Sequence, residues 1–316
     1  MILINIKKNK KYYSELLDEW LLDRKESVKE SSYIKYETII NNLIKPQLGQ
    51  IDIKKITEKT ILEFFKTNKI QNTSNSTKKI ILIIINSTIK YGNKKKYLKK
   101  INKISIPIKT KHKVNYFTKV EQEILDNYLQ KNLNLRNLGI LLALYTGLRI
   151  GELCGLKWQD VDFINKTLSV NRTVQRIKNN NKNISKKTVL ITSTPKTEHS
   201  KRIIPLPEFL INILKEYASV DEYYIFTNSV KPKDPRAYEK YFASTLKKCS
   251  IRNLNFHALR HTFATISREA GIDIKVLSEI LGHSSYHITQ EIYVHISVDF
   301  KRDSIDSLVN YLKINN

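Results

Sequence analysis

The 316 residues carry 55 Lys and Arg against 30 Asp and Glu, a formal net charge of +25. This excess favours nucleic acid as the partner, with an anionic membrane surface as the alternative. The longest apolar run, residues 80–85, is far below the roughly 18 residues of a membrane span, so we expect a soluble chain. Cys154 and Cys249 cannot form a CxxC pair, which excludes that type of metal or redox site and fits a reducing cytoplasm.

The length allows two modest domains, each with its own core. In residues 1–105 apolar side chains recur at helical spacing between polar breaks, which predicts a bundle of about four helices. Pro46 and Gly49 are expected to end the second helix. The predicted helices cover residues 12–25, 31–44, 57–65 and 76–91.

The smaller N-terminal part is the more basic one. Residues 1–116 hold 26 Lys and Arg against 10 Asp and Glu, whereas residues 117–316 hold 29 against 20. The densest run is residues 94–100, KKKYLKK, which is either a solvated helix end or, with Tyr97 inside it, a contact to a phosphate backbone. The candidate DNA-binding residues are Lys35, Lys94, Lys95, Lys96, Lys99 and Lys100.

Residues 106–116 show no hydrophobic period and contain Pro107, which is typical of a linker. Thr118 then begins the pattern T-x-x-E with Glu121, a capping box that opens a helix. We therefore expect a helical domain over residues 1–105 and a second domain over residues 117–316.

The second domain alternates helices with a few strands. An apolar helix over residues 137–145 should break at Thr146-Gly147 and resume over residues 149–156. From His257 onward the chain reads as helix again, with Gly271 and Gly282 as stops. Runs rich in Val, Ile and Thr predict strands over residues 167–173, 189–193 and 202–206. The expected fold class is mainly α with a small antiparallel β-sheet, in two domains.

Histidines near the C-terminal end raise the question of a metal site. His283 and His287 are four residues apart, but Gly282 should end the helix before them, and no HExxH or CxxC pattern accompanies them. A metal site is therefore disfavoured, and His287 is expected to have a structural or surface role.

Two arginine-containing motifs, TGLRIGEL (146–153) and HALRH (257–261), offer another chemistry. On a helix beginning near His257, Arg260 shares one face with the imidazole, so both can approach the same small anion. Convergence of Arg149 with them would suit a phosphate. The alternative is that Arg149 and Arg260 only pair with Glu152 and other acids.

The order of these motifs resembles the tyrosine recombinase (phage integrase) family. TGLRxxEL is followed by Lys196 between two predicted strands, then HxLRH, LGH (281–283) and, ten residues later, Tyr293. This resemblance covers residues 117–316. The N-terminal helices, with LIKPQLG at 43–49, resemble that family's helical, SAM-like core-binding domain.

The resemblance implies a metal-free DNA transesterification without cofactors. Tyr293 would attack a phosphate to give a 3′-phosphotyrosyl link, and Lys196 would protonate the leaving 5′-oxygen. Arg149 and Arg260 would bind the non-bridging oxygens, and Glu152 would orient its neighbours. His257 and His283 would add hydrogen bonds or assist proton transfer from the tyrosine.

It further implies double-stranded DNA with paired half-sites as substrate, a tetramer on DNA, a possible excision factor, and action in the bacterial cytoplasm. Integration and excision of a mobile element compete with Xer-like dimer resolution and with inversion; the long Asn- and Lys-rich segment 176–187 favours an integrase. A type IB topoisomerase and a non-catalytic DNA-binding protein remain as alternatives. Beyond Tyr293, a helical apolar stripe comprises Ile305, Leu308, Val309 and Leu312.

Overall fold

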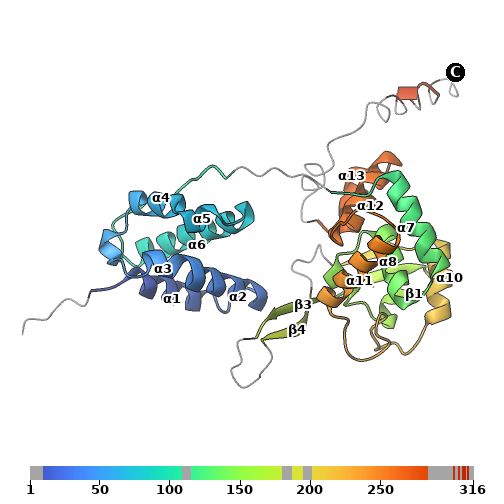
Figure 1. The fold of residues 1–316 in the computed structure, drawn as a ribbon, viewed down its shortest axis with the longest axis horizontal. Helices are drawn as coiled ribbons and strands as arrows, with labels where there is room; N and C mark the ends of the chain where they lie inside the picture. Colours follow the sequence, from blue (N-terminus) through green and yellow to red (C-terminus); the bar gives the residue numbers. More distant parts are fainter. Residues whose placement is uncertain are drawn as a thin grey trace, which may run out of the picture. The chain divides into compact units, whose positions relative to one another are not determined.

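The computed structural model of the 316-residue chain describes residues 10–108, 115–179, 187–194 and 201–283, together with residues 302, 305, 306, 308–310 and 312. The chain divides into two compact units, Met1–Lys111 and His112–Asn316 (Figure 1). Each unit has its own hydrophobic core.

The N-terminal unit is helical, as predicted. The aromatic residues of its first helix anchor the bundle: Tyr13 Oη lies 2.9 Å from Thr88 Oγ1, and Trp20 Nε1 donates to Ser87 Oγ at 3.2 Å. Both partners lie on the longest helix, so the first and last helices pack directly. The helices are α1 (Tyr13–Asp23), α2 (Glu30–Ile39), α3 (Lys45–Leu48), α4 (Glu58–Lys66), α5 (Asn68–Gln71) and α6 (Asn75–Lys94), with a 3-10 turn, η2, at Ile53–Lys55.

The prediction that Pro46 ends the second helix is wrong. After α2 the chain forms one π-helical turn, η1 (Ile40–Ile44), and then α3, which contains Pro46 at its second position. Proline lacks an N–H and its ring collides with the carbonyl four residues earlier, and the wider π turn accommodates both. The helical path therefore continues to Gly49, whose N–H still donates to Lys45 O at 2.9 Å.

In the second unit the capping box opens the first helix as predicted. Thr118 Oγ1 accepts from the Glu121 N–H at 3.2 Å, and the Thr118 N–H donates to Glu121 Oε2 at 2.8 Å. Gly147, with φ +65°, ends the next helix. Gly271 and Gly282 also have positive φ, at +84° and +65°, where the two predicted stops lie. The helices are α7 (Lys119–Lys131), α8 (Leu135–Thr146), α9 (Ile150–Leu153), α10 (Glu208–Tyr217), α11 (Pro235–Lys248), α12 (His257–Glu269) and α13 (Ile274–Leu281).

Helix α9 is shorter than the predicted helix over residues 149–156, because the residues after it form backbone hydrogen bonds with residues 223–225. The Ile225 N–H donates to Leu156 O at 3.0 Å, and the Trp158 N–H donates to Tyr223 O at 3.1 Å. The chain therefore leaves the helix and enters a 3-10 turn, η3 (Trp158–Asp160). Helices α10 and α11 lie outside the predicted elements. Helix α8 is the centre of this unit's core, with Leu138, Ile140, Leu141, Leu142 and Ala143 fully buried.

The strands are antiparallel, as expected, but they form two sheets. The predicted strand 167–173 is interrupted because Asn171 and Arg172 both bond to Asp160. One sheet has the order β1-β2-β5 and the other pairs β3 with β4, so the strands on either side of residues 194–201 belong to different sheets. The strands are β1 (Val161–Asp162), β2 (Thr167–Val170), β3 (Thr173–Lys178), β4 (Thr188–Ser193) and β5 (Arg202–Pro205).

The described tail residues, from 302 to 312, are helical. The apolar side chains of Ile305, Leu308, Val309 and Leu312 are 40–60% exposed. In the part of the chain that the structure describes, no helix has the length and apolar character to cross a bilayer.

Candidate active site

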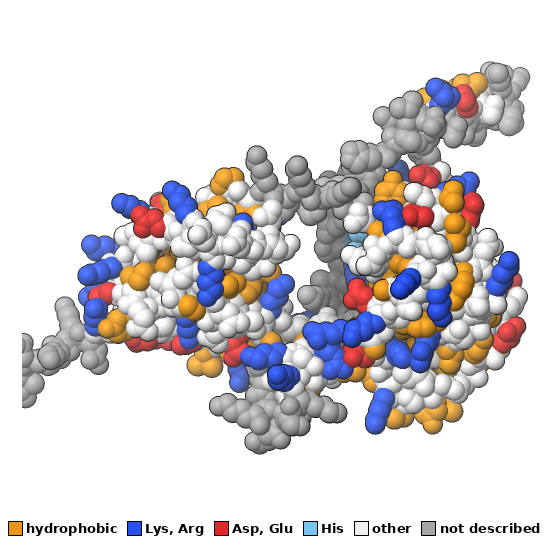
Figure 2. Space-filling view, in the orientation of Figure 1, with side chains coloured by type: hydrophobic (Ala, Val, Ile, Leu, Met, Phe, Trp, Pro, Cys, Tyr) orange, Lys and Arg blue, Asp and Glu red, His pale blue; other side chains and the backbone are white. Residues whose placement is uncertain are grey.

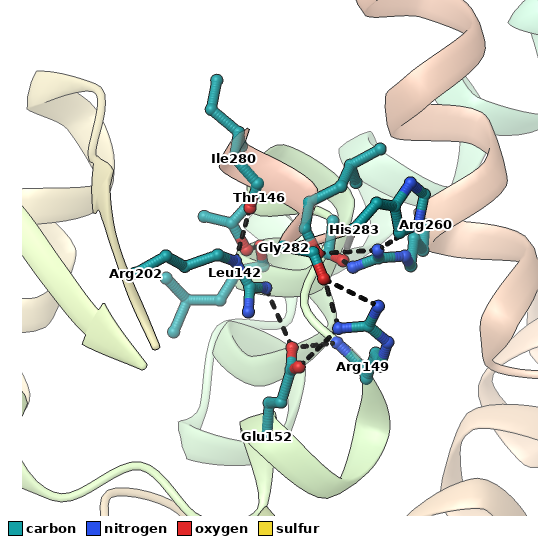
Figure 3. Close-up of polar contacts among 11 residues, drawn as sticks. Leu142, Thr146, Arg149, Glu152, Arg202, Arg260, Ile280, Gly282 and His283 are labelled. Carbon is teal, nitrogen blue, oxygen red and sulfur yellow. Dashed lines mark hydrogen bonds and ion pairs between the residues drawn. The ribbon is translucent and has the colours of Figure 1, made fainter. Parts of the chain in front are cut away.

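Arg149 is positioned by the turn between α8 and α9. Glu152 holds it at two points: Arg149 Nη1 donates to Oε1 at 2.7 Å, and the Arg149 backbone N–H donates to Oε2 at 3.0 Å (Figure 3). Both bonds are donated by Arg149 to the one carboxylate at the start of α9, so the helix end and the guanidinium are fixed together. The Arg149 side chain remains 36% exposed, which leaves part of the guanidinium open to a ligand.

Glu152 is buried between two arginines. Its side chain is 5% exposed, and Oε2 also accepts from Arg202 Nη2 at 2.9 Å. Burial alone would raise the pKa of Glu152, but Arg202 and Arg149 outweigh burial and lower the pKa to about 2. A carboxylate that stays ionised at all physiological pH values orients its neighbours and is unsuited to proton transfer.

Arg260 extends from α12 into the same region and is only 2% exposed. Its Nη1 donates to Gly147 O at 2.9 Å, and its Nη2 donates to Leu281 O at 2.7 Å. The guanidinium therefore joins the end of α8 to the end of α13, and it lies beside Arg149 in Figure 3.

The contact between Arg260 and His283 assigns a tautomer. Arg260 Nη2 lies 2.7 Å from His283 Nε2. A guanidinium only donates hydrogen bonds, so Nε2 must be the unprotonated acceptor and the imidazole proton is on Nδ1. Burial and the charges of Arg260, Arg149 and Arg202 lower the pKa of His283 to about 3. His283 is therefore neutral in the free protein.

His257 and His261 lie one turn apart on α12, with their rings 4.6 Å apart in an edge-to-face arrangement. The pKa of His257 is lowered to about 4. The largest cause is partial desolvation, and His261, Arg260 and Arg149 add smaller effects. Part of the His257 side chain still reaches the surface. Desolvation and Arg260 also lower the pKa of His261. A bound anion would stabilise the protonated imidazoles and raise these pKa values.

Four of the six predicted catalytic residues are therefore brought together: Arg149, Arg260, His257 and His283. Arg149 does form an ion pair with Glu152, which was the alternative to phosphate binding. In this pair the Arg149 side chain nevertheless remains partly exposed, and it lies beside Arg260. Such a cluster of cations and neutral imidazoles can bind and polarise a phosphate. Lys196 and Tyr293 lie outside the described residues, as do Tyr286 and His287.

Arg202 is a site residue that the sequence did not reveal. It is the first residue of β5, and its side chain is 5% exposed between Glu152 and α13. The burial of Glu152 and its second arginine partner are seen only in the structure. From the sequence, a partner on a distant strand could not be chosen among the many lysines and arginines.

The candidate DNA-binding lysines are on the surface of the N-terminal unit. Lys35 is exposed on α2, and the run that begins at Lys94 follows the end of α6. Tyr97 does not present a free ring, because it packs partly buried against the core and Lys11 Nζ lies 3.6 Å from its centroid. Figure 2 shows Lys and Arg spread over the visible face of this unit. The exposed lysines of the run are Lys94, Lys95, Lys96, Lys99 and Lys100.

Comparison with known proteins gives the family. Residues 116–299 match the Phage integrase family, and residues 12–67 match Phage integrase, N-terminal SAM-like domain. The chain belongs to the phage integrase family. A XerC-like tyrosine recombinase of Caldanaerobacter subterraneus subsp. tengcongensis is 31% identical, covering 93% of this chain and 82% of that protein. The integrase of Staphylococcus phage L54a is 29% identical, covering 92% and 90% respectively.

Solved structures show the same fold. The Tn1549 transposon integrase, in complex with a circular intermediate DNA, aligns with a TM-score of 0.76 at 21% identity, covering 94% of this chain and 99% of that one. A lambda integrase dimer bound to a core site aligns with a TM-score of 0.65 at 19% identity, covering 90% and 95%. The expected fold class is confirmed, and this family member is a tyrosine recombinase, an enzyme of site-specific DNA recombination.

Proposed function

We propose that this recombinase integrates and excises a mobile genetic element, cutting and rejoining each strand through a 3′-phosphotyrosyl intermediate on Tyr293. The observation that carries the proposal is the convergence of Arg149 and Arg260 with two neutral imidazoles around the end of α13. The relatives include a phage integrase and the ICEBs1 integrase of Bacillus subtilis, which supports the mobile-element role. Because one relative is XerC-like, resolution of chromosome dimers is the alternative function, and DNA inversion is another.

In this proposal the scissile phosphate binds against Arg149 and Arg260. Negative charge builds on the non-bridging oxygens in the transition state, and two guanidinium groups fixed by other contacts stabilise it without reorganising. His283, with its proton on Nδ1, and His257 are neutral before the substrate binds. Each imidazole can therefore donate one hydrogen bond to the phosphate or take up a proton.

The covalent steps balance without an external reagent. The Tyr293 oxygen attacks phosphorus as its phenolic proton passes to a neutral imidazole, that of His257 or His283; the bond to the 5′-oxygen breaks, and Lys196 supplies the proton that makes the 5′-hydroxyl. Religation reverses these steps with a different 5′-hydroxyl. The phosphodiester energy is kept in the phosphotyrosyl bond, so neither ATP nor a cofactor is required.

We propose that residues 1–105 form a core-binding domain that binds DNA. Residues 106–116 would be the linker to a catalytic domain over residues 117–316. The candidate contacts to the phosphate backbone are the exposed lysines named above. Two half-sites and two duplexes call for four protomers, which is supported by the lambda integrase tetramer bound to a Holliday junction, a structure that this fold resembles. An excision factor would set direction, and the place of action is the bacterial cytoplasm, where the chromosome lies.

The test is the substitution Tyr293→Phe. We expect it to abolish the covalent protein–DNA adduct on a duplex carrying the element's core site, because the nucleophilic oxygen is removed. DNA affinity should change less than about threefold, since one hydroxyl is lost from a large basic surface. The adduct is measured by denaturing electrophoresis and the modified residue by mass spectrometry.

Tyr286→Phe is the matched control, because it removes a tyrosine hydroxyl seven residues away and should leave the adduct intact. An adduct mapped to Tyr286 would overturn the assignment of the nucleophile. Cleavage that requires added zinc would instead return His283 and His287 to the metal interpretation.

A further inference from the structure

Three arginines, from the turn before α9, from β5 and from α12, meet the C-terminal end of α13. Arg202 Nε donates to Ile280 O at 2.5 Å, Arg260 Nη2 donates to Leu281 O at 2.7 Å, and Arg149 Nη2 lies 3.4 Å from Gly282 O (Figure 3). The last carbonyls of a helix have no partners within the helix and form the negative end of its dipole. Consecutive carbonyls are thus each bonded to a cation, and His283 follows directly.

Arg202 differs from Arg149 in its exposure and from Arg260 in its bond to a carboxylate. Its side chain is 5% exposed, whereas that of Arg149 is 36% exposed, and it is bonded to Glu152 on one side and to α13 on the other. Glu152 in turn holds both the guanidinium and the backbone of Arg149. One continuous path of hydrogen bonds therefore runs from β5 through Arg202 and Glu152 to Arg149.

We propose that Arg202 is a positioning residue for strand cleavage, which sets the direction of Arg149 through Glu152 and fixes the end of α13 that carries His283. The inference rests on the proposed function, because it concerns the same phosphate site. Without Arg202, Glu152 would keep a single arginine partner and Ile280 O would lose its donor. Arg149 would then sample several directions, and a misplacement of about 1 Å can reduce a reaction rate about 100-fold.

The experiment measures single-turnover cleavage at saturating DNA with the full chain. We expect Arg202→Met to slow cleavage by about 10- to 100-fold while DNA affinity stays within about threefold of wild type. Arg202→Lys should recover part of the rate, because an ammonium group keeps the charge beside Glu152 but lacks the planar fork that reaches two partners.

A double-mutant cycle with Arg149→Ala tests whether Arg202 affects cleavage by positioning Arg149 or by an independent effect on the structure. If Arg202 acts through Arg149, adding Arg202→Met to the Arg149→Ala protein should slow cleavage further by less than about threefold. If the two effects multiply in full, Arg202 does not act through Arg149 and the inference is wrong. Should Arg202→Met fail to fold, Arg202→Lys takes its place in the cycle.

Arg172→Met is the matched control. Arg172 is another largely buried arginine of the same unit, paired with Asp160 and donating to Gly155 O. It should lose thermal stability yet cleave, once folded, within about threefold of wild type. If it slows cleavage as much as Arg202→Met does, the effect is general destabilisation. Absence of any adduct with the wild-type protein would instead refute the proposed function, so the two failures are distinguishable.

Discussion

The His283 imidazole is held neutral by its neighbours, and this has a consequence for pH. Protonation at Nε2 would remove the lone pair that accepts from Arg260 and place a fourth cation near three guanidinium groups. The lowered pKa values of His283 and His257, about 3 and about 4, express this cost. In the unfolded chain both groups titrate near 6.5.

We therefore predict that the free protein loses stability as the pH falls from about 6.5 towards 4. In this window the unfolded state binds more protons than the folded state, so the free energy of unfolding decreases on acidification. The measurement is the thermal midpoint of the free chain between pH 7 and pH 5. His283→Gln, whose amide oxygen can still accept from Arg260, should show a shallower decline.

Bound DNA provides the second arm of this experiment. A phosphate beside the imidazoles stabilises their protonated forms, so the wild-type complex should lose less stability on acidification than the free chain. An equal slope for His283→Gln and wild type would show that His283 does not contribute to the pH dependence.

For single residues, the sequence was sufficient to predict a contact where both partners belong to one motif. TGLRxxEL predicts Arg149 and Glu152 as neighbours, and the first turn of α9 brings them together. The sequence could not give Arg202, because its contact with Glu152 joins residues fifty positions apart and depends on how β5 pairs with β2.

Among the elements, the turn after α8 combines a left-handed backbone with close packing. Gly147 has φ +65°, and a Cβ there would lie 2.7 Å from Phe263 Cδ1 and 2.8 Å from Leu281 Cδ2. Its carbonyl accepts from Arg260. The close approach of α8, α12 and α13 that assembles the site therefore depends on the absence of a side chain at this position.

Gly147→Ala should destabilise the protein through two effects. The left-handed backbone costs about 1–2 kcal/mol for a residue with a Cβ, and overpacking adds about 1–3 kcal/mol. Because relief of the clash moves Leu281 or Phe263, cleavage should fall as well. Denaturant unfolding and the single-turnover rate are the measurements.

Gly271→Ala is the control, because Gly271 has φ +84° but a Cβ there would meet nothing within 4 Å. It should show the backbone cost alone and cleave normally. Equal losses of stability in the two variants would mean that packing around Gly147 contributes nothing.

Helices whose ends carry local chemistry were predictable, as Thr118 with Glu121 shows for α7. Elements ended by distant contacts were not. Helix α9 ends shortly before Leu156, whose carbonyl pairs with the 223–225 segment. Strand β2 ends before Asn171, whose side chain donates a hydrogen bond to Asp160. The path through Pro46 was also unpredictable, because a π turn has no sequence signal of its own.

For the molecule as a whole, the apolar stripe of the tail stands out because, in the part of the chain that the structure describes, its four side chains are 40–60% exposed. A short helix with exposed Ile305, Leu308 and Leu312 needs a surface to bury them. We predict that this surface is on a neighbouring protomer of the DNA-bound tetramer. The periodicity break before Thr118 predicts the domain division, whereas the apolar stripe alone does not identify the partner of the tail.

Deleting residues 303–316 should leave binding of one protomer to one half-site unchanged, weaken cooperative filling of paired half-sites, and abolish strand exchange. Electrophoretic mobility shifts on single and paired half-sites, with a recombination assay, are the measurements. Leu308→Asn should reproduce the loss of cooperativity, and Asp306→Asn, an exposed polar position of the same helix, should not. Full cooperativity and full recombination in the truncated chain would exclude the tail as the coupling element.

The arginines bonded to the end of α13 also bear on which phosphates the recombinase can use. Arg260 is only 2% exposed, and three of its five N–H donors already bond to Gly147 O, Leu281 O and His283 Nε2. A small free anion gives up its own hydrogen bonds to water to reach so buried a guanidinium, so its net gain in free energy is small. A phosphate within DNA is held in place by the other contacts of the duplex. Inorganic phosphate at cellular concentrations should therefore be a poor inhibitor of this site.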